Sequence, residues 1–209
     1  STPHNRIEIP ASLVNTAYFY HVTCIMADVA GILDKKEDEH HLHTLAETIR
    51  KNFNAAFYND VTHHYWEGKQ GADVFALAFG LVLEGKQEKV FSALLEHLKK
   101  VNYHFDTGIL ATPLLLKVLT ENGRADLAYK LMNQRDFPSY GYLADKKNNT
   151  LWETWNGDGN DEGCGHCHPM FGSVVAWFYN SLAGIKPDLV NPGMKHFYVE
   201  PIIVSGLEY

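Results

Sequence analysis

The sequence alternates between two kinds of predicted helix, and no other feature restricts the possible fold as strongly. Four segments are apolar on nearly every face, which is typical of helices that have no side open to water. Three other segments carry a single apolar stripe at steps of three and four residues, between charged and polar side chains. The apolar segments are 13–33, 72–83, 109–119 and 170–183, and the striped segments are 37–57, 87–101 and 125–133. The alternation predicts an all-α fold in which an inner layer of helices is backed by an outer layer.

The connections between these helices place the long loops at one end of the fold. Short glycine-containing turns at 84–86 and 122–124 lead from an apolar helix to the striped helix that follows. Longer loops at 58–69, 102–108 and 137–168 lead from a striped helix to the next apolar helix, so they must emerge together at the opposite end. Long loops gathered at one end of a rigid scaffold are where a functional site is expected.

The unequal spacing of the apolar helices distinguishes a ring from a solenoid. These helices begin near residues 12, 70, 109 and 169, whereas a straight solenoid would show nearly equal repeats. Helical hairpins packed side by side around a ring form an α/α toroid, which is the architecture we expect.

A change of character after Gly184 predicts a second domain. Residues 195–205 are rich in aromatic and β-branched side chains around Pro201, which is typical of one or two strands. Because an isolated hairpin is only marginally stable, we expect these strands to begin a β domain. The predicted domains are a partial α/α barrel over 1–185, and a linker with the first strands of a C-terminal β domain over 186–209.

Charge and composition limit the possible partners. The chain has 18 Lys and Arg residues against 25 Asp and Glu residues, and its formal net charge is −7. This acidic balance, without any basic run, argues against nucleic acid as the main partner. Polar residues interrupt every apolar stretch before it reaches about 18 residues, so we expect no transmembrane span and no membrane partner. Three cysteines are too few for a disulfide framework in a chain of 209 residues.

The densest group of candidate functional residues surrounds Glu153 in the long loop 137–168. Trp152 and Trp155 flank this carboxylate. Indole rings beside a carboxylate offer apolar platforms for the faces of a sugar, and they can shift the carboxyl pKa by excluding water. The structural alternative is an aromatic cluster in which Glu153 forms a salt bridge.

Two histidines and a tryptophan occur in another of the long loops. His63, His64 and Trp66 lie within the loop 58–69, at the end of the fold where we expect the site. They either contact a substrate or anchor the loop, and the sequence does not separate these two roles.

A second motif overlaps the end of the loop 137–168. Cys164, Cys167 and His168 match the pattern Cys-x-x-Cys-His, in which two thiols attach a c-type haem and the histidine is an axial ligand. Together with His166, the same residues could instead bind zinc. His168 also stands at an expected helix N-terminus, where it could serve as a cap. A metal- or haem-binding helical module is therefore an alternative function, although no other feature supports haem.

Several motifs, taken in order, resemble the catalytic domain of bacterial α-L-rhamnosidases, which are glycoside hydrolases with an (α/α)6 barrel. The motifs are Thr16-Ala-Tyr-Phe-Tyr, Asp106-Thr-Gly-Ile-Leu-Ala-Thr, Glu121-Asn-Gly-Arg-Ala-Asp-Leu-Ala-Tyr, Phe137-Pro-Ser-Tyr-Gly-Tyr, Thr150-Leu-Trp-Glu-Thr-Trp, His168-Pro-Met-Phe-Gly and Ala183-Gly-Ile. The resemblance covers nearly the whole chain and implies the C-terminal part of such a barrel. The α/α toroid expected from the helix pattern agrees with it.

The resemblance also implies roles for individual residues. Glu153 matches the general base of an inverting mechanism, in which it would deprotonate the water that attacks the anomeric carbon of a terminal α-L-rhamnose. The residues that match positions in or near the rhamnose pocket are Trp152, Trp155, His168, Thr107, Tyr140 and Tyr142. No cofactor is implied, and a periplasmic or secreted setting would suit the family.

One part of the family's catalytic motif has no match in this sequence. The family's general acid belongs to an acidic and Arg-rich motif before the first helix, and residues 1–11 do not resemble it. The segment 160–165 likewise has no family counterpart. An inverting glycosidase needs two carboxylates about 6.5–9.5 Å apart, and Glu153 alone is supported by a motif. Other loop carboxylates are those of Asp106, Asp158, Asp161 and Glu162.

The sequence therefore predicts an incomplete catalytic domain with little activity by itself. Its expected partners are a rhamnose-containing glycoside or polysaccharide, and either the remainder of a parent barrel or a complementary chain. An open ring would expose the apolar flanks of its first and last helices, and such a patch needs a covering partner. A sugar-binding fragment without catalytic activity is the other alternative.

Overall fold

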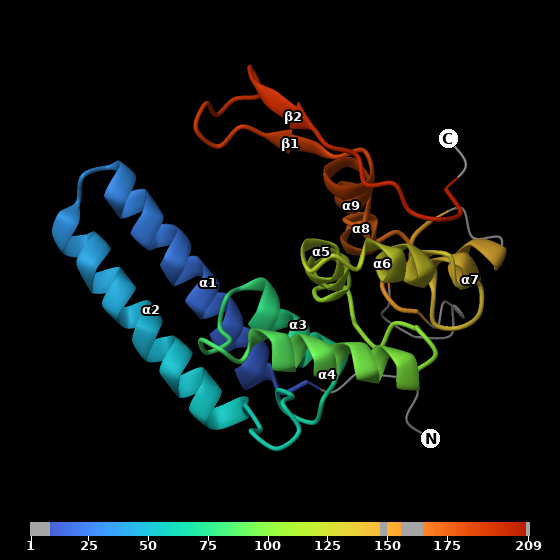
Figure 1. Ribbon diagram of the computed structural model, residues 1–209, viewed down its shortest axis with the longest axis horizontal. Helices are drawn as coiled ribbons and strands as arrows, with labels where there is room; N and C mark the ends of the chain where they lie inside the picture. The colour runs from blue at the N-terminus through green and yellow to red at the C-terminus, as the bar shows by residue number, and fades with distance from the viewer. Residues whose placement is uncertain (1–8, 147–149, 156–164, 208–209) are drawn as a thin grey trace. The chain divides into compact units, whose positions relative to one another are not determined.

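The structure is a computed structural model that describes residues 9–146, 150–155 and 165–207 (Figure 1). The chain forms two compact units, an N-terminal unit within Ile7–Lys100 and a C-terminal unit within Val101–Tyr209. Among the described residues, no helix is both long enough and apolar enough to cross a bilayer.

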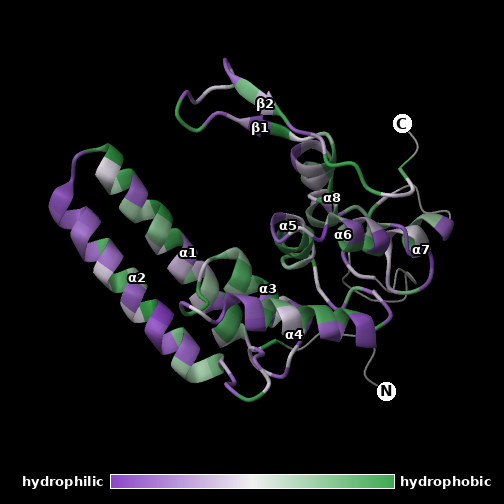
Figure 2. Cartoon of the chain, viewed as in Figure 1, coloured by the Kyte–Doolittle hydropathy of each residue, from purple (hydrophilic) through white to green (hydrophobic). Residues whose placement is uncertain are grey.

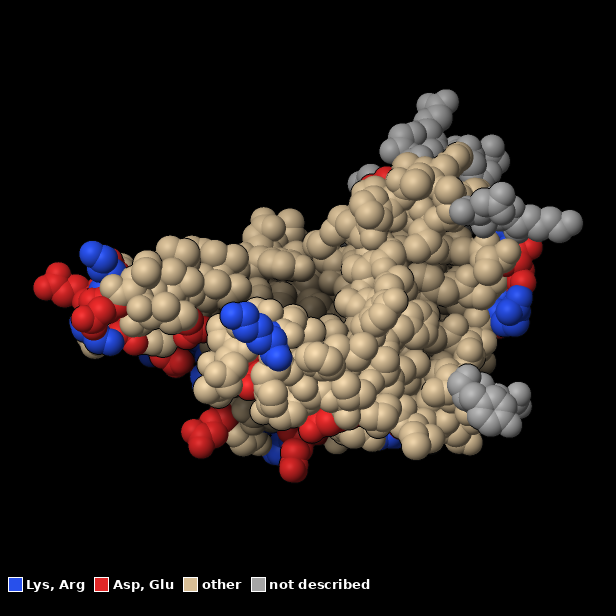
Figure 3. Space-filling model, turned by 90° about the horizontal axis from the view of Figure 1, so that it is seen from above, with Lys and Arg blue, Asp and Glu red and all other residues tan. Residues whose placement is uncertain are grey.

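Two helical hairpins build the N-terminal unit. Its helices are α1 (Ala11–Ile32), α2 (Lys36–Phe57), α3 (Gln70–Ala78) and α4 (Gln87–Lys100). In the first hairpin, the striped helix α2 turns Ala46, Ile49 and Phe53 inward, as its sequence pattern predicts. Charged residues cover the tip of this hairpin, where α1 gives way to α2 (Figure 3).

Helix α1 buries one face and exposes the other, so the expectation that it is enclosed on all sides is wrong. Small residues such as Ala17, Ala27 and Ala30 lie on the buried face. On the other face, Val22 and Met26 are 52% and 50% exposed, and hydrophobic residues run along the helix in Figure 2. The exposed large side chains of α1 are Phe19, Val22, Ile25, Met26, Val29 and Ile32. The flank of this first helix is thus open, as expected for an unclosed ring.

Helix α3 is shorter than the predicted segment 72–83. It ends at Ala78 because Gly80 takes a positive φ of 74°, a conformation that breaks the helix and suits glycine. Leu81 and Val82 then continue as buried, non-helical chain. The apolar character of Leu81 and Val82 therefore reflects burial and not helix.

The C-terminal unit begins with a helical hairpin of α5 (Thr112–Glu121) and α6 (Ala125–Met132). Pro113 lies in the first turn of α5, where its missing amide hydrogen costs nothing. Gly123, with φ of 73°, forms the tight turn between the two helices. The interior of the hairpin contains four leucines whose side chains are completely buried: Leu115, Leu116, Leu119 and Leu131.

A short helix, α7 (Tyr140–Asp145), interrupts the long loop 137–168 and was not predicted from the sequence. Its N-cap is Ser139, whose buried hydroxyl accepts a hydrogen bond from the amide of Tyr142 at 3.0 Å. This serine is the local signal for the helix, but six residues are too few to show a helical period.

The last apolar segment forms three short pieces where one helix, 170–183, was predicted. They are α8 (Pro169–Gly172), α9 (Val175–Trp177) and the π-helix η1 (Phe178–Leu182). At the first break, the hydroxyl of Ser173 bonds to the carbonyl of Met170 and competes with regular helical bonding. In the last piece, the amide of Ala183 bonds to the carbonyl of Phe178, five residues back.

The chain then forms a two-stranded antiparallel hairpin of β1 (Ile185–Pro187) and β2 (Phe197–Val199), with Lys186 opposite Tyr198. Strand β2 falls in the predicted segment 195–205, whereas β1 was not predicted. Residues Phe197, Tyr198 and Val199 are all substantially exposed. The chain after β2 packs back on the helices, where the hydroxyl of Tyr129 donates to the carbonyl of Gly206 at 3.0 Å.

Candidate functional site

Glu153 lies where two segments of the long loop pair with each other. Its amide donates to the carbonyl of Gly165 at 2.9 Å, and the amide of Gly165 donates to Glu153 Oε2, also at 2.9 Å. Two residues before Glu153, the carbonyl of Leu151 accepts a hydrogen bond from the amide of His168 at 2.8 Å. The residues that follow the undescribed part of the loop therefore return to the carboxylate.

Trp152 and His166 form a stacked aromatic pair beside Glu153. Their ring centroids are 4.7 Å apart and their planes differ by 23°. Trp152 is half-buried and His166 is exposed. The pair thus presents a flat, partly open aromatic surface on the loop segment that carries Glu153, of the kind that packs against the face of a sugar ring.

Trp155 lies in a buried cluster and is only 8% exposed. Its ring packs against Phe105, Tyr140 and Phe171, with centroid separations of 5.2, 5.1 and 4.2 Å. Its indole nitrogen donates to the carbonyl of Thr107 at 2.7 Å. Trp155 therefore joins the loop 102–108 to the loop of Glu153, and these two long loops meet as predicted.

Thr107, the acceptor of this indole hydrogen bond, is completely buried. Its hydroxyl lies 2.7 Å from the hydroxyl of Thr112, which in turn donates to the carbonyl of Gly108 at 2.9 Å. Within this structure, Thr107 stabilises the loop of Glu153, because its carbonyl accepts the indole hydrogen bond of Trp155. A contact between Thr107 and a sugar stays a prediction.

The two tyrosines predicted near the pocket lie on α7 and differ in their surroundings. The hydroxyl of Tyr140 donates to the carbonyl of Phe171 at 2.9 Å, and burial raises the pKa of this phenol well above its usual value. The ring of Tyr142 packs against Phe137 at 5.3 Å, with the ammonium of Lys146 at 5.0 Å from its centroid. Tyr140 thus belongs to the same aromatic cluster as Trp155.

His168 is the N-cap of α8, and its Nδ1 accepts a hydrogen bond from the amide of Met170 at 3.4 Å. Pro169 follows at the first helical position, as predicted. A Cβ placed on Gly165 would lie 3.5 Å from Glu153 Oε2 and 3.8 Å from His168 Cδ2. The carboxylate and the imidazole therefore face the same small space.

A family model described as the bacterial alpha-L-rhamnosidase 6 hairpin glycosidase domain matches residues 5–182. The chain belongs to this family. Its curated relatives include alpha-L-rhamnosidases of Streptomyces avermitilis, at 36% identity, and Formosa agariphila, at 33%. The alignments cover 93% and 95% of this chain but 19% and 22% of those proteins, so the chain spans about a fifth of their length.

Solved structures of family members share the fold of this chain, which matches a segment of their length. The Streptomyces avermitilis alpha-L-rhamnosidase complexed with L-rhamnose matches 96% of this chain with a TM-score of 0.87 and 33% identity, over 20% of its own length. The enzyme of Dictyoglumus thermophilum matches 91% of this chain with a TM-score of 0.84 and 36% identity, over 21% of its own length. These matches confirm the predicted α/α-barrel fold class.

Membership of the rhamnosidase family favours the glycosidase interpretation over a metal- or haem-binding module. Cys164 lies outside the described residues. Across the parts of the chain that are described, no group of three or more His, Cys, Asp or Glu residues is arranged to hold a metal ion. His166 instead stacks on Trp152, and His168 caps a helix.

The alternative carboxylates are divided between described and undescribed parts of the rhamnosidase segment. Asp158, Asp161 and Glu162 lie outside the described residues. Asp106 is half-buried in the loop 102–108, one residue before Thr107. Its use as a second catalytic group stays a hypothesis.

In the N-terminal unit, the structure favours an anchoring role for His64. Its Nδ1 lies 2.7 Å from Oδ2 of the completely buried Asp73, whose Oδ1 accepts from the amide of Tyr65 at 2.7 Å. Burial raises the pKa of Asp73, and the hydrogen bonds from His64 and Tyr65 oppose this shift. His63 similarly bonds to the hydroxyl of Tyr58 at 3.0 Å.

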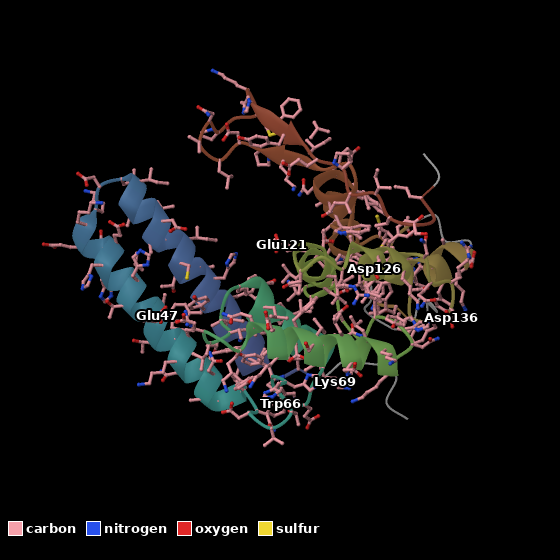
Figure 4. All side chains as sticks on the ribbon, viewed as in Figure 1. Glu47, Trp66, Lys69, Glu121, Asp126 and Asp136 are labelled. Atoms are coloured by element: carbon pink, nitrogen blue, oxygen red, sulfur yellow. The ribbon has the colours of Figure 1, made fainter. Side chains whose placement is uncertain are left out.

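Trp66, by contrast, is 41% exposed and has a positive φ of 52°. Figure 4 labels Trp66 and Lys69, which both belong to the loop 58–69. Between this loop and α4 lies an open pocket of about 630 Å³, whose lining includes His63, His64 and Glu96. Trp66 does not line this pocket, and its part in substrate contact stays a hypothesis.

Proposed function

We propose that this chain supplies the general-base side of an α-L-rhamnosidase active site, with Glu153 as the base. The observation that carries the proposal is the fixed Glu153 carboxylate, bonded through Oε2 to the Gly165 amide and facing the same space as His168; the Trp152–His166 stack lies on the same loop. An oriented carboxylate can deprotonate a water molecule, and an aromatic surface beside it can hold the sugar in line for attack.

The substrate that fits this proposal is a terminal α-L-rhamnose in a glycoside or polysaccharide. Family membership supports the reaction class, and the related structure from Streptomyces avermitilis was determined with L-rhamnose. In the proposed mechanism, Glu153 takes a proton from water, which attacks the anomeric carbon on the face opposite the leaving group. Because the water attacks from that opposite face, the first sugar product is the β anomer, and the departing oxygen must be protonated by a second carboxylic acid.

We propose further that this second acid comes from another body of protein, either the remainder of a parent barrel or a complementary chain. The open apolar flank of α1 supports this view, because a stripe with half-exposed Phe19, Val22 and Met26 is typical of an interface. The last helical pieces also expose Val175 and Tyr179. Each flank would pack against a neighbouring hairpin of a closed ring.

The proposed domain division follows from the same view. Residues 1–185 would form part of the barrel, and 186–209 would begin a β domain. Strand β1, which starts at the boundary residue Ile185, and strand β2 would be its first strands. The exposed Phe197 and Val199 would then be covered by further strands.

A grafting experiment tests the proposed function. This chain would replace the matching segment of the Streptomyces avermitilis relative, and hydrolysis of an α-L-rhamnoside would be followed by NMR for the graft and for the chain alone. We expect turnover by the graft with β-rhamnose as the first product, and little turnover by the chain alone. Rhamnose binding without turnover by the graft would instead support a sugar-binding role, and initial release of α-rhamnose would contradict inversion.

A further inference from the structure

The donor of the hydrogen bond to the Glu153 carboxylate is a main-chain amide, that of Gly165, and not a side chain. Because Gly165 N donates to Oε2 while Gly165 O accepts from Glu153 N, a single residue holds both the backbone and the carboxylate of Glu153. We propose that Gly165 is the positioning residue for Glu153, and that its amide fixes the carboxylate through Oε2 so that the other oxygen, Oε1, receives the proton of the attacking water. This inference rests on the proposed role of Glu153 as the base.

An amide donor suits this task for a physical reason. A hydrogen bond from N–H to an ionised carboxylate is stronger and more directional than one between neutral groups. A main-chain donor also has no side-chain rotamers, so it does not move unless the chain itself moves. Glu153 is half-buried in a loop, and without such a donor its carboxylate could rotate away from the water.

The segment that carries Gly165 is itself held in place. His168 N donates to the carbonyl of Leu151, and the hydroxyl of Thr150 donates to the carbonyl of His166. Together with the stacking of His166 on Trp152, these bonds place Gly165 in a short paired stretch.

Glycine also keeps open the space between the carboxylate and His168. The Cβ of an alanine at this position would make ordinary contacts of 3.5 Å with Glu153 Oε2 and 3.8 Å with His168 Cδ2. Larger side chains would enter the space that the two functional groups face. Gly165→Ala is accordingly a matched control that retains the amide, and Gly165→Pro removes the amide hydrogen.

The positioning bond can be measured without any enzyme activity. Amide hydrogen exchange followed by NMR in the full chain would compare wild type with Glu153→Ala, which removes the acceptor, and Glu153→Gln, which keeps an acceptor oxygen. We expect exchange of the Gly165 amide to accelerate about tenfold in the alanine variant and to be largely restored in the glutamine variant. The His168 amide, bonded to Leu151, is the internal reference and keeps its exchange rate.

An unchanged Gly165 exchange rate in Glu153→Ala would overturn the proposal, and so would equal acceleration of the His168 amide, because the whole loop would then have opened. The same graft used for the proposed function gives a kinetic test. We expect kcat of Gly165→Pro to fall about tenfold below that of Gly165→Ala, with KM of the two variants within about threefold. Equal kcat values would also overturn the positioning role. If the graft hydrolyses no rhamnoside, the proposed function fails, and the exchange rates still decide the role of Gly165.

Discussion

The indole nitrogen of Trp155 donates a hydrogen bond to the carbonyl of Thr107 at 2.7 Å, between two loops that are 48 residues apart in sequence. Both residues are buried, so water cannot replace either partner. This bond joins the loop before α5 to the loop that carries Glu153. It shows that one of the two tryptophans flanking Glu153 stabilises the fold, whereas Trp152 lies nearer the surface.

We therefore predict that Trp155→Phe destabilises the C-terminal unit. The substitution keeps an aromatic ring but leaves the buried carbonyl of Thr107 without its donor, which costs about 1–3 kcal/mol in the free energy of unfolding. Urea unfolding would measure the loss. Trp66→Phe is the matched control, because this indole is 41% exposed, and we expect it to change stability by less than about 0.5 kcal/mol. Equal effects of the two substitutions would contradict the account.

Asp73 gives a prediction about pH. Burial raises its pKa above the ordinary value of 3.8, so the folded state holds the proton of this carboxyl more tightly than the unfolded state does. The stability that this group contributes is present below pH 3.8 and is lost as pH rises through its folded pKa. We expect wild type to lose stability relative to Asp73→Asn as pH rises above 3.8, measured by urea unfolding at each pH.

Asp126 provides a control with the opposite sign. Hydrogen bonds from Arg124 lower the pKa of Asp126 below 3.8. In one of them, Arg124 Nε donates to Asp126 Oδ1 at 2.9 Å. The stability that this carboxylate contributes is therefore present above pH 3.8 and lost as pH falls through the folded pKa. Compared with Asp126→Asn, wild type should lose its advantage on acidification. If the stability difference from wild type changed with pH in the same direction for Asp73→Asn and Asp126→Asn, the opposite pKa shifts of the two carboxyls would be refuted.

The open flank of α1 predicts self-association or dye binding by the chain. Val22 and Met26 lie one turn apart and are about half exposed. Introducing Val22→Glu and Met26→Glu together should reduce binding of an apolar dye and weaken any self-association seen by sedimentation velocity. The control is Asn52→Glu with Ala56→Glu, at the same spacing on the exposed face of α2. A similar reduction in the control would show that added charge alone, and not the α1 flank, is responsible.

The helical period predicted the helices whose apolar stripes pack against other parts of this chain. It failed for segments whose structure depends on contacts that the period does not show. The segment 37–57 alternates clearly and forms α2 almost as predicted. The segment 13–33 is uniformly apolar, but apolarity reports the need for burial and not the presence of a partner, and one face of α1 is open. The segment 170–183 was predicted as one helix because its apolar pattern does not reveal the break at Ser173.

The sequence predicted only part of the candidate site, because it does not show how residues pack across the loops. Side-chain types identified Glu153, its two tryptophans and His168 as candidates, and the loop lengths predicted that 102–108 and 137–168 would meet. The sequence does not show that Trp155 is buried while Trp152 stacks on His166, because that difference depends on residues packed across the loop. Gly165 was missed because a main-chain amide leaves no side-chain signal in a sequence.

The kcat of the graft carrying Glu153→Gln tests directly whether Glu153 is the base of a rhamnoside-hydrolysing site. The substitution keeps the shape of the side chain but removes its ability to accept a proton. We predict a loss of about 10²–10⁴ in kcat, while Glu67→Gln, at an exposed position of the loop 58–69, retains the activity of the unmodified graft. Hydrolysis by Glu153→Gln at the rate of the unmodified graft would contradict this role of Glu153.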